Sequence, residues 1–115
     1  MYLFPYEKVE RGSRVVLYGM SGVGRAYVAQ IMVNRYCDII FAVDRNYKRL
    51  SHRDVPVMAP EEIKKADYDY VVISATSKQV PGIMHALQKL GVPQKKIVYA
   101  CDIVDTYLWG GIGLS

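Results

Sequence analysis

Short apolar runs rich in β-branched residues alternate with longer amphipathic stretches along this chain. No other feature of the sequence constrains the fold as strongly. Such runs suit strands buried on both faces of a parallel sheet, and the amphipathic stretches suit the helices that cover it. We expect strands at Val15–Tyr18, Ile39–Val43, Val55–Met58, Tyr70–Ser74 and Ile97–Tyr99.

Helices are expected between these runs. Apolar residues recur at helical spacing from Val23 to Asn34, and again from about Gln79 or Pro81 to Leu90. A further helix start is expected at Pro60, because proline needs no amide donor in a first turn and two glutamates follow it. Right-handed crossovers between five parallel strands then predict a three-layer α/β sandwich with strand order 3-2-1-4-5.

The length of 115 residues suits one domain, because compact domains usually run ~100 to 150 residues. We assign this domain to residues 1–100. The remaining tail, 101–115, is more apolar than free chain ends usually are. We expect it to pack on this domain, on a second copy, or on a neighbouring domain.

The balance of 15 Lys and Arg against 11 Asp and Glu gives a net charge of +4. This is mild for nucleic-acid binding, where basic residues usually gather on one face. They gather once, at Arg45, Lys48, Arg49 and Arg53. We therefore expect an anionic small molecule, a nucleotide, as the partner and no nucleic acid.

No apolar run approaches the ~20 residues that span a bilayer, and the N-terminal residues lack the pattern of a secretory signal. We therefore expect no membrane span and a cytoplasmic location.

Cys37 and Cys101 have no metal-ligand spacing, so no metal site is expected and buried free thiols are favoured.

The first expected strand runs directly into a glycine-rich turn. A turn between the first strand and first helix of a parallel sheet directs free backbone N–H groups and the positive end of a helix at one place, which suits phosphate. The glycines follow GxxGxG rather than GxGxxG, and Ser21 stands where the middle glycine would be. We expect nucleotide binding by Gly19, Met20, Ser21, Gly22, Val23 and Gly24.

Five further residues join this candidate site. Asp44, at the end of the second strand and twenty residues after Gly24, is placed to bind a ribose diol, whereas Arg45 is placed to pair with a 2′-phosphate. The sequence thus leaves NAD-like and NADP-like ligands open. Arg25 is a cation in a first helical turn, where a bound phosphate would compensate its charge. The turn that contains Ala75 and Thr76 follows the fourth strand, across the topological switch point.

The chain resembles a known group of domains in the stretches FPYEKVERGSRVVLYGMSGVGRAYVAQI, VDRN, VMAPEEI, YDYVVISA and LGVPQKKIVY, across about residues 4–100. These are the Rossmann-like nucleotide-binding domains attached to bacterial glycosyltransferases and sugar-modifying transferases. The CoA-binding and nucleotide-sugar-binding N-terminal domains of sugar acetyltransferases are more distantly similar. The family turn is usually YGAGxVG, which Gly19, Val23 and Gly24 match and Ser21 does not. The resemblance implies binding of NAD(P) or a nucleotide-sugar, with catalysis in another domain.

Three functions remain open. The first expectation is a nucleotide-binding module of a larger bacterial carbohydrate or cell-surface polysaccharide enzyme, such as a glycosyltransferase. The alternatives are a regulatory or oligomerising module that senses a dinucleotide or CoA, and an NAD(P)-dependent oxidoreductase. We nominate no catalytic residue, because no tyrosine has a lysine four places on, and the positions of His52 in the basic loop and His85 within an expected helix favour structural histidines over a general base.

Overall fold

The computed structural model describes residues 2–100. The expected apolar tail, 101–115, and Cys101 therefore lie outside the described residues. The main elements are β1 (Arg14–Tyr18), α1 (Gly22–Asn34), β2 (Asp38–Val43), β3 (Val57–Met58), β4 (Tyr70–Ile73), α2 (Val80–Lys89) and β5 (Ile97–Tyr99). Short 3-10 helices lie at Tyr6–Lys8 (η1), Tyr47–Arg49 (η2), Pro60–Lys65 (η3), Ser77–Gln79 (η4) and Gln94–Lys96 (η5).

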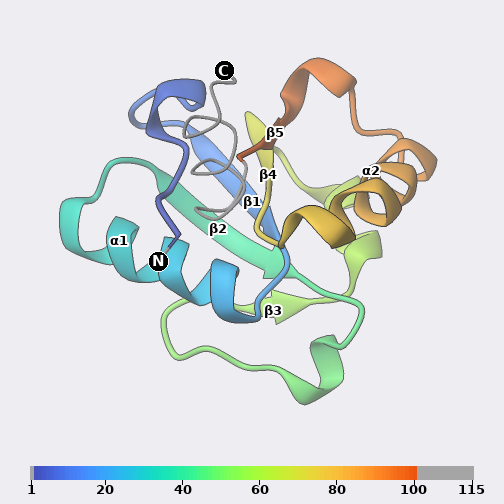
Figure 1. The fold of residues 1–115 in the computed structure, drawn as a ribbon, viewed down its shortest axis with the longest axis horizontal. Helices are drawn as coiled ribbons and strands as arrows, with labels where there is room; N and C mark the ends of the chain where they lie inside the picture. The colour runs from blue at the N-terminus through green and yellow to red at the C-terminus, as the bar shows by residue number, and fades with distance from the viewer. Residues whose placement is uncertain (1, 101–115) are drawn as a thin grey trace, which may run out of the picture.

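The five strands form one sheet of order β3-β2-β1-β4-β5, and every pair in it is parallel (Figure 1). The predicted α/β class and the order 3-2-1-4-5 are confirmed. The chain winds outward from β1 first toward β2 and β3, then returns to place β4 on the other side of β1. The switch point, where a ligand cleft opens in folds of this kind, is therefore between β1 and β4 at their carboxyl ends.

Successive residues of each strand face opposite sides of the sheet, and the sequence supplies apolar residues for both. Val15 and Leu17 of β1 pack in one buried cluster, whereas Val16 and Tyr18 pack in the other. The first cluster lies under α1, and the second lies under α2 and η3. A strand that is buried on both faces needs an uninterrupted run of apolar residues. The strands could therefore be located in the sequence from such runs.

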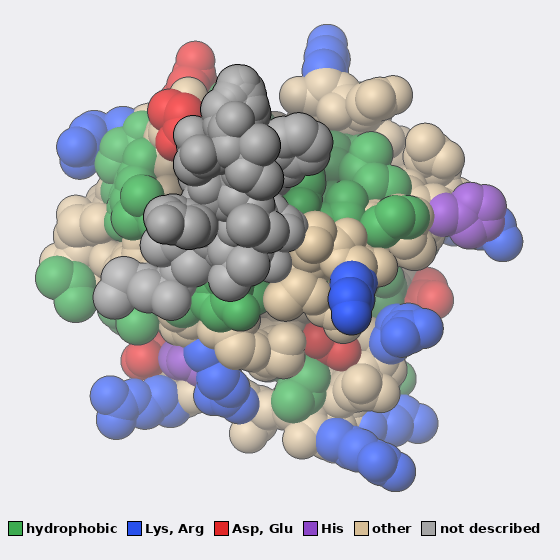
Figure 2. Space-filling view, viewed as in Figure 1, with side chains coloured by type: hydrophobic (Ala, Val, Ile, Leu, Met, Phe, Trp, Pro, Cys, Tyr) green, Lys and Arg blue, Asp and Glu red, His purple; other side chains and the backbone are tan. Residues whose placement is uncertain are grey.

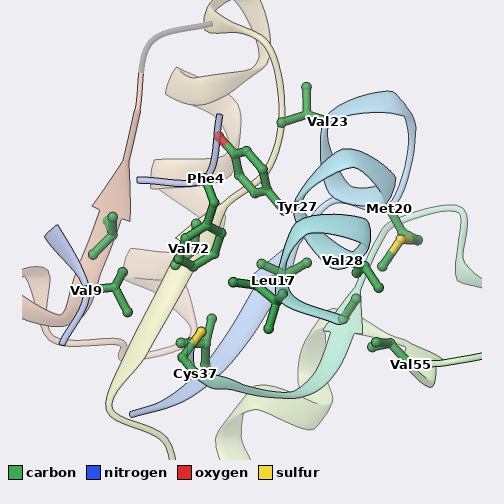
Figure 3. Close-up of a cluster of buried hydrophobic side chains, with 14 residues drawn as sticks. Phe4, Val9, Leu17, Met20, Val23, Tyr27, Val28, Cys37, Val55 and Val72 are labelled. Atoms are coloured by element: carbon green, nitrogen blue, oxygen red, sulfur yellow. The ribbon is translucent and has the colours of Figure 1, made fainter. Parts of the chain in front are cut away.

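The N-terminal segment completes the α1 side of the core. Phe4, which is fully buried, packs edge-on against the Tyr27 ring with centroids 5.4 Å apart. Figure 3 shows Phe4 and Val9 beside Val72 of β4, on the part of the sheet that α1 does not cover. The side-chain amide of Gln30 holds this segment, since it accepts from Phe4 N–H at 3.0 Å and donates to the Tyr2 carbonyl at 2.6 Å. This packing was not predicted from the sequence.

The largest difference between expected and observed strand boundaries is at β3, which is reduced to Val57–Met58. The other strands begin and end within one residue of the expected positions, and β4 ends at Ile73 rather than Ser74. The helix expected at Pro60 is a 3-10 helix with Pro60 in its first turn and Ile63 buried beneath it. Among residues 2–100, no helix combines the length and apolar character needed to cross a membrane.

Candidate functional site

The glycine turn after β1 is shaped by two close backbone approaches. Gly19 has φ of 120°, and a Cβ there would lie 2.6 Å from the Ser74 carbonyl oxygen. A Cβ on Gly24 would overlap the Gly19 carbonyl oxygen. At Gly22, by contrast, a Cβ would meet nothing within 4 Å. Gly19 and Gly24 are therefore required by the fold, whereas Gly22 leaves open space over the start of α1.

The start of α1 carries an uncompensated positive end. Ser21 is the N-cap residue, but its side chain bonds none of the helix N–H groups, and the described first turn holds no acidic residue. Two nearby amides are already used: Gly19 N–H donates to the Val43 carbonyl at 2.8 Å, and Arg25 N–H donates to the Ser21 carbonyl at 3.0 Å. Helix starts of this kind attract anions because their first N–H groups have no partner within the helix.

Asp44 is fixed against this turn by its own carboxylate. One oxygen accepts from Met20 N–H at 3.0 Å, and the other accepts from Asn46 N–H at 2.8 Å. Each oxygen keeps further lone-pair capacity, because an ionised carboxylate offers about four acceptor positions. The side chain therefore joins the end of β2 to the glycine turn while leaving capacity for hydroxyl donors.

A cavity of about 470 Å³ opens at the carboxyl ends of β1, β2 and β4. This volume lies within the ~300 to 1,000 Å³ usual for small-molecule sites. Five of the predicted site residues line it: Gly19, Ser21, Asp44, Arg45 and Ala75. The structure thus brings the glycine turn, the acid after β2 and the turn after β4 to one cleft, as the parallel topology predicts.

The other predicted residues take different places. Met20, Val23 and Gly24 are buried, so they contribute backbone at most. Thr76 lies beside the cavity as the N-cap of η4, where it pairs with Gln79 in a capping box. The Arg25 guanidinium donates to the Ser51 carbonyl at 3.1 Å and lines a separate groove with Met32 and His52.

One wall of the cleft and a tyrosine in its lining were not predicted from the sequence. The residues that were not predicted are Tyr18, Asn46, Leu50, Lys78, Gln79, Gly82, Ile83 and Ala86. Most come from the segment after β4, which was interpreted only as a helix packing on the sheet. Gly82, a glycine in the first turn of α2, was the available signal, since a Cβ there would meet nothing within 4 Å.

Tyr18 is the unusual member of this wall. The residue is 5% exposed, and no described residue hydrogen bonds to its hydroxyl. The oxygen is accessible to solvent, because every inaccessible side-chain nitrogen or oxygen in residues 2–100 has a partner, and Tyr18 is one of the residues that line the cavity. Burial raises the pKa of Tyr18, with Arg45 opposing the shift and Asp44 and Glu61 adding to it. The phenol therefore keeps its proton at neutral pH and can donate it.

The basic residues after β2 are exposed. Arg45, Lys48, Arg49 and Arg53 belong to the loop that joins β2 to β3. Figure 2 shows Lys and Arg side chains along the lower rim of the molecule, where this loop lies in Figure 1. Within residues 2–100, no three His, Cys, Asp or Glu side chains are arranged to hold a metal ion.

The sheet order and the cleft at its switch point define a Rossmann-like α/β domain. The sequence matches the family described as C2185-like, N-terminal, over residues 11–98, and the chain belongs to that family. No match was found among the curated proteins.

Solved structures with the same fold include RSP, a Rex-family repressor, at a TM-score of 0.64 and 15% identity over 90% of this chain. RSP in complex with β-NADH has a TM-score of 0.62 and 16% sequence identity, also over 90% of this chain. RSP in complex with β-NAD+ and operator DNA has a TM-score of 0.63 and 15% identity, again over 90% of this chain. This chain covers 59%, 60% and 57% of those three chains, respectively.

The expectation that nucleic acid is excluded as a partner is contradicted by the RSP complex with operator DNA. That expectation rested on the mild charge of this domain. This chain covers 57% of the RSP chain. The net charge of a domain of this size is therefore no evidence against nucleic acid as a partner. We withdraw the exclusion.

Proposed function

We propose that this domain binds a nucleotide of the NAD type in the cleft between β1 and β4 and acts as a ligand-sensing regulatory module. The observation that carries the proposal is the meeting of three elements at one cavity: the start of α1, the Asp44 carboxylate and the turn after β4. Phosphate suits the first and a ribose diol suits the second.

This hypothesis of a regulatory module replaces our first expectation, which was a module of a glycosyltransferase. The similar structures named above are of a repressor, and two of them hold NAD+ or NADH. A nucleotide-sugar as the ligand and a carbohydrate enzyme as the parent protein lack comparable support. The cytoplasmic location stays a prediction.

The test is a thermal-shift panel of NAD+, NADH, NADP+, UDP, UDP-glucose and CoA on the 115-residue chain. A ligand at 100 times its dissociation constant stabilises the folded state by ~2.7 kcal/mol, which is readily measured in a domain of this size. We expect a shift with NAD+ or NADH and no turnover of either. A shift confined to UDP-glucose would instead favour the first expectation, a nucleotide-sugar-binding module of a carbohydrate enzyme.

A substitution pair identifies the site. Gly22→Val places a branched side chain over the start of α1, where the fold leaves open space, and should abolish the shift. Ala29→Val adds the same side chain on the exposed face of α1 and should leave the shift unchanged. Equal shifts in both variants would mean that the glycine turn does not hold the ligand.

A further inference from the structure

The outer face of α1 is unusually apolar for a helix at the surface. Its exposed residues Arg25, Ala29, Met32 and Val33 follow the spacing i, i+4, i+7, i+8, so they form one stripe along the helix. Arg25 is the only charged residue of α1, whereas a surface helix normally carries charged and polar residues on the face that points away from the core. Val33 is 86% exposed and Met32 is 38% exposed. Contiguous exposed apolar residues of this kind mark surfaces that a partner covers.

A groove of about 590 Å³ lies beside this stripe, between α1 and the loop that precedes β3. Ala29, Met32 and Val33 line it on the helix side, and residues 51–54 line it on the loop side. Figure 2 shows hydrophobic and basic side chains next to each other at the lower left of the molecule, where α1 and this loop lie in Figure 1. The groove therefore combines an apolar wall with a polar one.

The polar wall offers hydrogen-bond donors and positive charge. The Arg25 guanidinium donates to the Ser51 carbonyl at 3.1 Å, which joins the loop to the helix and leaves further N–H donors free. His52 Nδ1 accepts from Asp54 N–H at 3.1 Å, so Nε2 carries the proton of the neutral ring and can donate it. Asp54 is the one acidic residue in the lining, and Arg53 pairs with it at 3.6 Å from a side chain that is 92% exposed. Such an exposed pair contributes little, so Arg53 can exchange it for another carboxylate.

We propose that this groove is a docking site for an acidic amphipathic segment of a partner protein. The apolar side chains of the segment pack against Ala29, Met32 and Val33, and its carboxylates pair with the guanidinium groups of Arg25 and Arg53. The apolar wall favours a protein segment in this groove over a phosphate backbone, which has no apolar face to pack against it. A second copy of the chain bound through the same groove would bring like charges together, which is unfavourable.

The groove is separate from the nucleotide cavity. Among the described residues, none lines both. The docking site therefore does not rest on the proposed function, and each can fail without the other.

Fluorescence anisotropy of labelled synthetic peptides of about 15 residues, titrated with the 115-residue chain, tests the proposal. The first peptide carries leucines at helical spacing and glutamates elsewhere. The second has the same composition in scrambled order, and the third has lysines in place of the glutamates. We expect the first peptide to bind about tenfold more tightly than either of the others, because it alone combines carboxylates with an apolar face.

Two pairs of variants locate the binding site. Val33→Glu places a carboxylate in the apolar wall and should weaken the first peptide about tenfold. Leu3→Glu makes the same change at an exposed apolar residue outside the groove and should leave the affinity unchanged. Arg53→Gln should weaken the peptide several-fold, whereas Lys95→Gln, at an exposed position outside the groove, should not.

Equal affinity for the ordered and scrambled acidic peptides, or an equal effect of Val33→Glu and Leu3→Glu, would overturn the docking site. Sedimentation of the chain, alone and with vesicles of phosphatidylglycerol and phosphatidylcholine, examines the other occupants. Dimerisation or vesicle binding that Val33→Glu abolishes would overturn the acidic segment in favour of a second copy or a lipid surface. The thermal shift with NAD+ should be the same in Val33→Glu and in the unmodified chain, which shows that the variant is folded.

Discussion

The buried hydroxyl of Ser74 donates a hydrogen bond of 2.6 Å to the carbonyl oxygen of Gly19. This bond joins the end of β4 to the glycine turn after β1, across the switch point where the cleft opens. The two backbones approach so closely that Gly19 has no room for a side chain. The floor of the cleft is therefore held by backbone packing and one hydroxyl rather than by residues that face the ligand.

Ser74→Ala should lower the free energy of unfolding by about 1 to 2 kcal/mol, because a buried carbonyl loses a donor. Urea denaturation followed by circular dichroism measures the change. Ser51→Ala is the control, since Ser51 is exposed and its hydroxyl makes no bond to the described residues. An equal effect of both substitutions would show that the bond to Gly19 contributes nothing specific.

Gly22 and Gly24 should respond in opposite directions to alanine. Gly24→Ala forces a Cβ onto the Gly19 carbonyl and should destabilise the domain by about 3 kcal/mol or more. Gly22→Ala meets open space in a helical position and should be neutral or stabilising by up to about 1 kcal/mol. Urea midpoints of the two variants give the comparison. Similar losses in both would contradict the packing role assigned to Gly24.

Asp44 should set the preference between NAD+ and NADP+. Its carboxylate is held beside the expected ribose by two backbone amides, and its negative charge repels a 2′-phosphate there. Asp44→Ala should weaken NAD+ about tenfold by calorimetry and spare inorganic phosphate. Asp69→Ala removes a similar bond, to Arg14 N–H at 2.8 Å, at the opposite end of β1 and serves as the control. Equal losses for NAD+ and phosphate would indicate a folding effect instead.

Burial, with a smaller contribution from Asp38, raises the pKa of the Cys37 thiol to about 11 from its usual 9.0. Because the folded-state pKa is the higher one, the stabilisation is complete below pH 9 and is lost as the pH rises toward 11. The loss should reach about 2 kcal/mol. Urea denaturation at pH 8 and pH 10.5 should show a smaller pH effect in Cys37→Ala than in the unmodified chain. An identical pH effect in both proteins would contradict the assignment.

The strands, their order and half of the cleft could be predicted from the sequence for a physical reason. A strand buried on both faces is a contiguous apolar run, and the parallel topology then brings Gly19, Asp44 and Ala75 together without further information. The opposite wall could not be predicted in the same way. Lys78 and Gln79 precede an amphipathic helix whose pattern reports only the face that packs on the sheet. Tyr18 was predicted only as a strand residue, because it belongs to the apolar run of the first strand. That run does not indicate whether the tyrosine hydroxyl has a hydrogen-bond partner.

The N-terminal segment was missed because it has no periodicity: it is held by side-chain bonds that join residues far apart in the sequence. Gln30 makes three of them, bonding to Tyr2, to Phe4 and, at 3.4 Å, to the Tyr6 hydroxyl, and the Tyr36 hydroxyl donates to the Tyr6 and Val9 carbonyls. Gln30→Ala should therefore lower the free energy of unfolding by about 2 kcal/mol and speed proteolysis within residues 2–9 before the rest of the domain is cut. Limited proteolysis with mass spectrometry identifies the first cut. Gln88→Ala, at an exposed position on α2, is the control, and an unchanged first cut in Gln30→Ala would mean that the packing of Phe4 and the bonds of Tyr36 hold the segment without Gln30.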